Sequence, residues 1–178
     1  HLETDGNPLF RGHIIVRQES PLQSLADLKG KRMAFGDQDS TMSHLVPQYM
    51  LEKAGVPLNK LAEHKFLGSH NNVVLAVLSG DFDAGAVKDE VFIKYEKQGL
   101  RDLAPTPYYS DHVFVTRSSL ASGTIQALRS AMLRLKDTPG GREILEAIKP
   151  HTTALVSVVD ADYDNLRQVM KALGTLEK

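Results

Sequence analysis

The segment Gly36-Asp37-Gln38-Asp39-Ser40-Thr41 joins a short apolar stretch to a helical pattern, and its residue types suit anion binding. The start of a helix leaves backbone N–H groups without partners and carries a positive partial charge. Together with the hydroxyls of Ser40 and Thr41, these N–H groups predict an oxyanion cradle that needs no Lys or Arg. The plainer interpretation, that Ser40 or Thr41 is only a helix cap, is favoured by this motif alone. The spacing of a Walker A loop is absent.

Three later turns add further candidate side chains. His70 stands at a predicted helix start, where an imidazole can donate a hydrogen bond to an anion, although a polar surface turn explains it equally well. Glu90 follows the predicted helix cap Asp89, and the alternative interpretation of Glu90 is an ordinary charged first turn. Asp111 precedes a predicted strand and is also typical of a simple turn.

Catalytic and metal-binding motifs are missing from the sequence. There is no cysteine, no G-x-S-x-G and no H-E-x-x-H, and the seven histidines have no ligand spacing. Asp111 and His112 are adjacent, which is expected to point them to opposite sides of a strand. We therefore expect no catalytic residue, no metal and no cofactor. An α/β enzyme acting on a phosphorylated substrate stays open, with His70 as its only plausible base.

Local patterns predict the elements that must position these turns. Strands alternating with short helices indicate an α/β sheet, in which ligands lie beyond the carboxyl ends of the strands. The expected strands are 13–16, 32–35, 63–67, 82–87, 101–104 and 112–116, and the expected helices are 42–53, 72–79 and 89–97, with a helical turn at 24–28. The remainder is expected to be helical, at 122–136, 141–148 and 162–173, with 154–159 as a doubtful strand. These last helices have no obvious sheet to cover, which suggests missing sequence.

Composition limits the classes of function. The 178 residues carry 21 Lys and Arg against 22 Asp and Glu, a net charge of 21 − 22 = −1, so nothing indicates nucleic-acid binding. The 42% hydrophobic content is that of a folded domain or two small lobes, and the apolar runs are too short to span a membrane.

An ordered set of motifs resembles the phosphonate/phosphite/phosphate-binding proteins of ABC importers. The set covers most of the chain, from about Phe10 to Arg167, and consists of 24–32, 35–37 with Ser40-Thr41, 68–70, 76–85 and 160–167. The resemblance implies an α/β protein with the type II periplasmic-binding-protein fold, here one complete α/β lobe plus C-terminal helices of an incomplete first lobe. It assigns 1–10 to a remnant of the first lobe, 11–117 to the second lobe and 118–178 to the helical part of the first. Most of the first lobe is then expected upstream.

The resemblance also implies roles for individual residues. Ser40 and Thr41 correspond to the hydroxyls that bind the oxyanion, and His70 to an imidazole donor. Glu90 and Asp111 correspond to carboxylates that meet the amine of aminophosphonates. Two ligand-binding positions depart from the family pattern: Phe10 stands where a Tyr is common, and the bulky Met42 follows the cradle.

The implied function is that of a periplasmic or extracytoplasmic solute-binding protein, not an enzyme, that delivers a phosphorus oxyanion to an ABC permease. Two ionised carboxylates would repel a phosphonate dianion, because two unit charges about 4 Å apart interact by roughly 4 kcal/mol at an effective dielectric constant near 20. The first expectation is therefore an aminophosphonate, and the second is phosphite or phosphate, whose acidic O–H a carboxylate can accept. A ligand sensor of the same fold, working with a histidine kinase, is the alternative.

Overall fold

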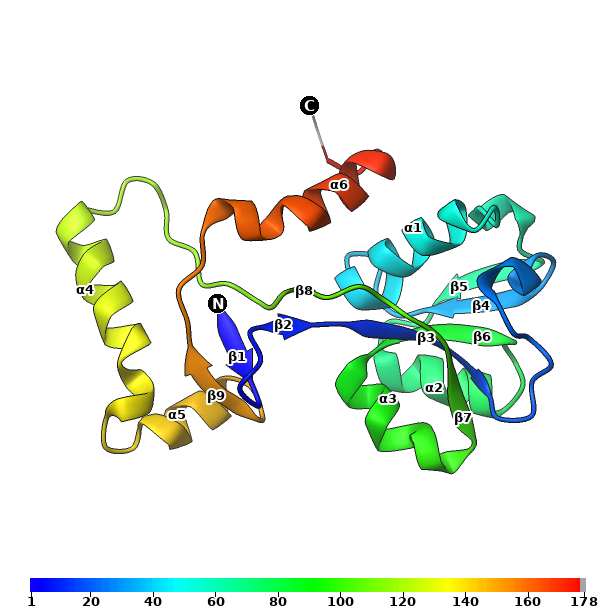
Figure 1. Cartoon of the computed structure of the whole chain (residues 1–178), viewed down its shortest axis with the longest axis horizontal. Coiled ribbons are helices and arrows are strands. Elements are labelled where there is room, and N and C mark those ends of the chain that lie inside the picture. Colours follow the sequence, from blue (N-terminus) through cyan, green and yellow to red (C-terminus); the bar gives the residue numbers. More distant parts are fainter. Residues whose placement is uncertain (177–178) are drawn as a thin grey trace. The chain divides into compact units, whose positions relative to one another are not determined.

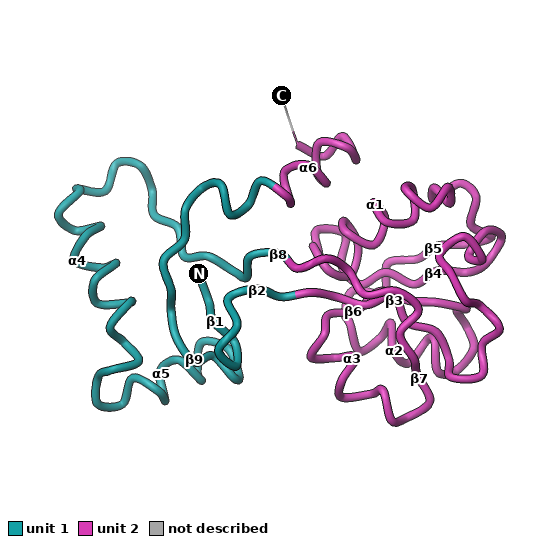
Figure 2. Tube along the Cα trace, viewed as in Figure 1, with its two compact units in different colours: residues 1–10, 109–164 teal, residues 11–108, 165–178 magenta. Residues whose placement is uncertain are grey.

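A computed structural model describes residues 1–176 and divides the chain into two compact units. Unit 1 combines residues 1–10 with 109–164, and unit 2 combines residues 11–108 with those from Asn165 onward (Figure 2). The first segment of unit 2 runs from Arg11 to Tyr108, whereas the resemblance implies a second lobe at 11–117. The assignment of segments to lobes stays a prediction.

Unit 2 is built on a mixed five-stranded sheet with the order β5-β4-β6-β3-β7 (Figure 1). Strand β4 runs parallel to β5 and β6, while β3 is antiparallel to β6 and β7. The carboxyl ends of β4, β5 and β6 therefore share one edge of the sheet. The strands are β3 (Gly12–Arg17), β4 (Arg32–Phe35), β5 (Glu63–Phe66), β6 (Ala84–Lys88) and β7 (Leu100–Pro105).

Helices cover both faces of this sheet. Helix α1 (Val46–Lys53) lies on one face, and α2 (His70–Leu78) and α3 (Asp89–Tyr95) lie on the other (Figure 1). The alternation of side chains along β3 explains the two layers, because Ile14 packs in the cluster with Leu51 of α1, while Ile15 packs with Val73 of α2. Short helical turns complete the unit, at Leu25–Leu28, Thr41–Leu45, Leu58–Lys60 and Glu96–Gln98.

The β-structure of unit 1 consists of short strand pairs. Strand β1 (Leu2–Thr4) pairs antiparallel with β9 (Thr152–Leu155), and β2 (Leu9–Phe10) pairs antiparallel with β8 (Tyr109–Ser110). A small core forms where Leu2 and Leu155 meet Leu145. The helices are α4 (Ser122–Leu133) and α5 (Gly141–Ile148), with short turns at Leu135–Asp137 and Asp160–Tyr163; α6 (Asp164–Ala172) follows, mostly in unit 2.

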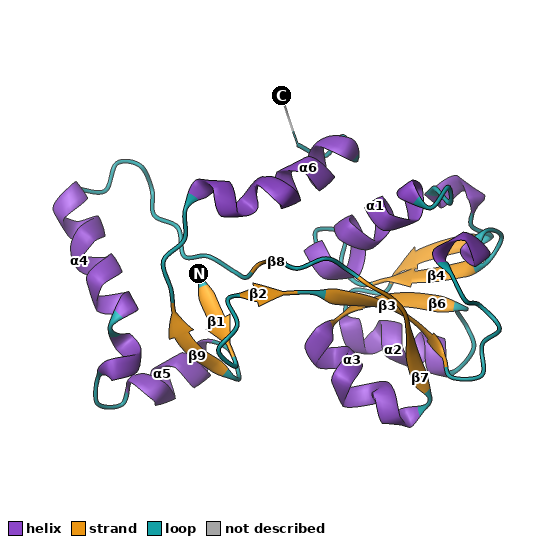
Figure 3. Cartoon of the chain, viewed as in Figure 1, coloured by secondary structure: helices purple, strands orange, loops and turns teal. Residues whose placement is uncertain are grey.

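The α/β character and most of the strands of unit 2 were predictable, but the strand expected at 112–116 is wrong. Residues 112–116 form a loop in the structure (Figure 3). Val115 is 83% exposed, and within residues 1–176 no strand pairs with this apolar stretch. Apolar alternation alone does not make a strand, because a strand also needs a hydrogen-bonded neighbour.

Two other expectations need correction. The C-terminal region does contain a strand, β9, which overlaps the doubtful stretch at 154–159 but begins earlier. Its partner is the very start of the chain, and a pairing over so long a separation leaves no local pattern in the sequence. Helix α2 begins at His70 rather than at residue 72, because Ser69 caps it.

Candidate oxyanion site

Three turns meet at the carboxyl edge of the unit 2 sheet. They follow β4, β5 and β6, and they carry Ser40 to Met42, His70 and Glu90 respectively. Backbone hydrogen bonds connect the first two turns, because the N–H of Gly68 donates to the carbonyl of Gly36 at 3.0 Å. The sheet therefore brings five of the seven predicted site residues to one edge of one unit.

The turn after β4 opens a helix in the way that the sequence suggests. Ser40 is the N-cap, and its Oγ accepts a hydrogen bond from the N–H of Ser43 at 3.1 Å. The capping interpretation is thus part of the structure, and the hydroxyl hydrogen of Ser40 is still able to donate to an anion. The N–H groups of Thr41 and Met42 lie in the first turn, where a helix supplies no acceptor for them.

The bulk of Met42 does not crowd this turn. Met42 as a whole is 2% exposed, and its sulfur lies 3.6 Å from Oγ1 of the buried Thr106. The backbone N–H is therefore the group of Met42 that is suited to meet a ligand. Thr41, in contrast, is only half-buried.

Ser43 holds the turn in place and was not singled out by sequence reasoning. Its fully buried hydroxyl donates to the carbonyl of Ala86 at 2.5 Å and accepts from the N–H of Gly36 at 2.7 Å. It connects the end of β4 to β6. The one available signal was a polar residue on the buried side of a helical pattern. The first turn, Thr41–Leu45, is a π-helix, and Pro47 in the next turn lacks the N–H that would continue regular bonding.

His70 has a defined tautomer. The N–H of Lys88 donates to its Nδ1 at 3.2 Å, so the neutral ring carries its proton on Nε2. Burial, with a smaller contribution from the charge of Lys88, lowers the pKa of His70 below its usual value. The ring is therefore a neutral Nε2–H donor at pH 7. This geometry fits the predicted role of hydrogen-bond donor to an anion.

A cluster of charged side chains around the buried His13 lies behind the turn after β6. His13 of β3, whose side chain is 3% exposed, places Nε2 2.6 Å from Asp89 and Nδ1 3.2 Å from Asp102. Burial alone would lower the pKa of His13, but the hydrogen bonds and charges of Asp102 and Asp89 outweigh it and raise that pKa. Asp89 also pairs with Arg11 at 3.5 Å. Sequence reasoning treated Asp89 only as a cap and did not find this cluster.

Glu90 is exposed, and its carboxylate pairs with the ammonium of Lys88 at 2.8 Å. It lies in the first turn of α3, as expected. Its ammonium partner precedes it by only two residues, and the sequence analysis did not consider that pairing.

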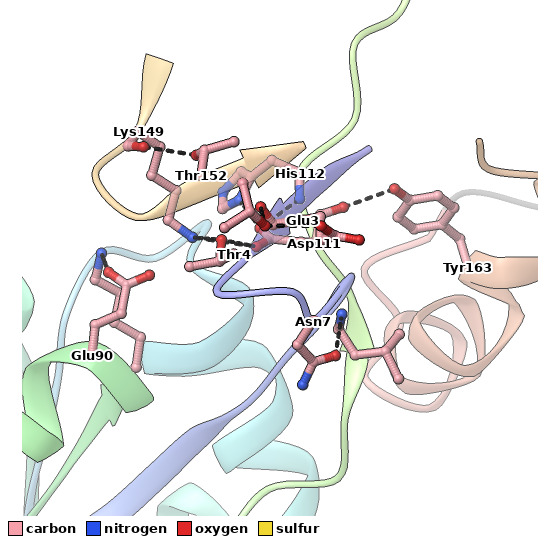
Figure 4. Close-up of polar contacts among 12 residues, drawn as sticks. Glu3, Thr4, Asn7, Glu90, Asp111, His112, Lys149, Thr152 and Tyr163 are labelled. Atoms are coloured by element: carbon pink, nitrogen blue, oxygen red, sulfur yellow. Dashed lines mark hydrogen bonds and ion pairs between the residues drawn. The ribbon is translucent and has the colours of Figure 1, made fainter. Parts of the chain in front are cut away.

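The remaining two predicted residues, Phe10 and Asp111, belong to unit 1. The Asp111 side chain is fully buried. Its Oδ1 accepts from the backbone N–H and the ring Nδ1 of His112 at 2.7 and 2.6 Å, and its Oδ2 lies 3.2 Å from Nζ of Lys149 and 3.3 Å from Oγ1 of Thr4 (Figure 4). Adjacent Asp111 and His112 thus contact each other, contrary to expectation, because the segment is irregular rather than a strand. The Phe10 ring lies 5.7 Å from that of His112.

Burial alone would raise the pKa of Asp111. The hydrogen bonds from His112 and the charge of Lys149 outweigh burial and lower the pKa to about 2. Asp111 is therefore ionised at neutral pH and is held by neighbours within its own unit.

Two findings concern other kinds of site. The described residues contain no cluster of three or more His, Asp or Glu side chains that suits a metal ion. Within residues 1–176, none of the helices combines the length and apolar character needed to cross a bilayer.

Comparison with protein families decides where the chain belongs. Residues 1–163 match the family described as "ABC transporter, phosphonate, periplasmic substrate-binding protein". The chain belongs to this family. The resemblance inferred from the sequence motifs is therefore confirmed, as is the periplasmic location at the level of the family. The family consists of substrate-binding proteins rather than enzymes, in agreement with the prediction.

Individual relatives are distant but cover nearly all of the chain. The probable ABC transporter phosphite binding protein PhnD1 of Prochlorococcus marinus (strain MIT 9301) is 26% identical over 94% of this chain and 62% of its own length. The phosphate-import protein PhnD of Mycolicibacterium smegmatis is also 26% identical, over 96% of this chain and 60% of its own length. The chain thus spans about three fifths of these curated relatives.

The fold agrees with a solved structure from the same family. PhnD1 of Prochlorococcus marinus in complex with methylphosphonate matches with a TM-score of 0.80 and 26% identity, over 98% of this chain and 71% of that one. The type II periplasmic-binding-protein fold expected from the sequence is confirmed.

Proposed function

We propose that the protein containing this chain is a periplasmic solute-binding protein that captures a phosphorus oxyanion and delivers it to an ABC permease. The hydroxyls of Ser40 and Thr41, the N–H of Met42 and the Nε2–H of His70 bind the anionic oxygens. The observation that carries the proposal is the placement of these donors on turns at one edge of the sheet, with the His70 tautomer fixed by the N–H of Lys88. Family membership supports the same ligand class.

The same geometry argues against an enzyme acting on a phosphorylated substrate. A general base needs an unprotonated nitrogen directed toward the substrate. The unprotonated Nδ1 of His70 accepts from the backbone, and its Nε2 carries the proton. His70 is therefore suited to donate to an anion and not to remove a proton.

The narrower expectations from the sequence stay predictions. They are the aminophosphonate ligand, the roles of Glu90 and Asp111 toward its amine, the aromatic contact from Phe10, and the sensor for a histidine kinase. Transport is proposed ahead of sensing because the relatives are named as transporter and import proteins.

Isothermal titration calorimetry on the full-length protein tests the proposal, with methylphosphonate, phosphite and phosphate as ligands and sulfate as the control anion. At least one phosphorus oxyanion is expected to bind with a Kd of roughly 1 μM or below. Thr41→Val removes one donor without changing side-chain shape and should weaken binding by about tenfold. The matched control is Thr124→Val, on the exposed surface of α4, and it should bind like the wild type. Equal affinity for sulfate, or no effect of Thr41→Val, would count against the proposal.

A further inference from the structure

The buried carboxylate of Asp111 has no remaining capacity for a ligand amine. An ionised carboxylate offers about four lone-pair positions. Four groups occupy them in unit 1: the N–H and ring nitrogen of His112 on Oδ1, and Thr4 and Lys149 on Oδ2 (Figure 4). None of the Asp111 side chain is exposed. A ligand ammonium could reach this carboxylate only by displacing one of these partners.

Lys149 supplies the positive charge that a ligand amine would otherwise bring. Its Nζ lies 3.2 Å from Oδ2 of Asp111, and its side chain is 18% exposed. A close pair of opposite charges presents little net field, so the repulsion between Asp111 and a phosphonate dianion largely cancels. An amine-bearing ligand was expected because ionised carboxylates repel a phosphonate dianion, and that repulsion is strong only for a carboxylate without an ammonium beside it.

Unit 2 shows the same arrangement around the second carboxylate assigned to a ligand amine. Nζ of Lys88 lies 2.8 Å from Oε2 of Glu90. Each of the two carboxylates that were expected to meet a ligand amine therefore has a lysine of this chain beside it. Glu90 is more exposed than Asp111, so water screens its ion pair with Lys88 more strongly. The lysine therefore neutralises the carboxylate more firmly at Asp111 than at Glu90.

We propose that Lys149 is a specificity-determining residue. Its ammonium pairs with the carboxylate of Asp111, so this carboxylate cannot bind a ligand amine, and the protein prefers phosphorus oxyanions that carry no amine. The inference rests on the proposed function and on the predicted place of Asp111 at the ligand. The preferred ligands are then alkylphosphonates, phosphite or phosphate, and aminoalkylphosphonates bind more weakly because their ammonium finds no unpaired carboxylate.

The test compares ethylphosphonate with 2-aminoethylphosphonate, which differ by the amine, in calorimetry on the full-length protein. The wild type should prefer ethylphosphonate. Lys149→Met removes the ammonium and keeps most of the side-chain volume, so the ratio of the two affinities should move toward the amine-bearing ligand by about tenfold or more. Lys136→Met, at an exposed position of the same unit, is the matched control and should leave the ratio unchanged.

A second variant covers the case in which Lys149→Met leaves Asp111 unpaired and fails to fold. Asp111→Asn removes the negative charge and keeps the side-chain shape. If Asp111 is saturated by its own unit, this variant changes the affinities for both ligands by the same factor. A selective loss of 2-aminoethylphosphonate binding, or a wild type that prefers that ligand, would overturn the inference while leaving the proposed function intact. If neither these ligands nor phosphite or phosphate bind the wild type, the proposed function itself fails.

Discussion

At the scale of single residues, the site depends on the direction of hydrogen bonds more than on formal charge. His70 is useful as a donor because a backbone N–H occupies its other nitrogen. Ser40 accepts from its own helix and still has a hydroxyl hydrogen to donate. The residue types of these two positions were readable from the sequence. The tautomer was not, because it depends on Lys88, a residue brought near by the pairing of distant strands.

Removal of the His70 donor should weaken oxyanion binding. His70→Ala is expected to raise the Kd for methylphosphonate by about 10- to 100-fold, because a hydrogen bond to a charged group contributes about 1.5–3 kcal/mol. His70→Gln places an amide N–H near the position of Nε2 and should recover part of the loss. The control is His64→Ala, at an exposed position on β5. Calorimetry that finds equal losses for His70→Ala and His64→Ala would remove His70 from the site.

The His13 cluster should make stability depend on pH with a defined sign. The pKa of His13 is raised in the folded protein, so its contribution is complete below the unfolded value of about 6.5 and is lost as pH rises through the folded pKa. His13→Gln should therefore lower the free energy of unfolding by about 1–3 kcal/mol at pH near 6, and by less at pH near 9.

Urea unfolding of the wild type and His13→Gln at both pH values measures this difference directly, since other titrating groups cancel between the two proteins. The exposed His64→Gln serves as the control. A stability difference that is constant with pH, or one that grows toward alkaline pH, would show that the imidazolium does not hold Asp89 and Asp102.

At the scale of elements, the predictable parts were those with local causes. The strands and turns of unit 2 follow from apolar runs, glycines and caps, and the site turns after β4 and β5 were located correctly. The apolar segment at 112–116 and the pairing of β1 with β9 were not predictable, because both depend on which distant segment offers a partner. The buried contacts of Ser43, His13 and Lys149 were not predictable for the same reason.

Gly36 is a position where one added methyl group should disturb the turn after β4. A Cβ at this position would overlap Oγ of Ser43, which connects β4 to β6. Gly36→Ala should therefore displace the turn that carries Ser40, lower the free energy of unfolding by about 1–3 kcal/mol and weaken methylphosphonate binding.

The matched control is Gly123→Ala in α4, where a Cβ meets nothing within 4 Å and the backbone is already helical. That change should be neutral or stabilising by up to about 1 kcal/mol. Urea unfolding and calorimetry of the two variants give the comparison, and a Gly36→Ala protein with normal stability and normal affinity would contradict the assigned role of Ser43.

At the scale of the whole molecule, family membership and fold are established, whereas the identity of the ligand is a proposal. Residues 1–163 match the periplasmic phosphonate-binding family, and the fold agrees with a methylphosphonate complex of a relative at a TM-score of 0.80. Three features of the candidate ligand residues bear on the ligand: Ser40 caps a π-helical turn, the N–H of Lys88 fixes the tautomer of His70, and the ammonium of Lys149 lies beside Asp111.

The carboxyl edge of the unit 2 sheet is the proposed binding site of the phosphorus oxyanion. A crystal structure of the full-length protein with methylphosphonate tests it most directly. We expect the phosphonate oxygens to lie within hydrogen-bond distance of the Ser40 and Thr41 hydroxyls and of Nε2 of His70, with Lys149 still paired to Asp111. A phosphonate bound away from this edge, with none of these three donors in contact, would contradict it.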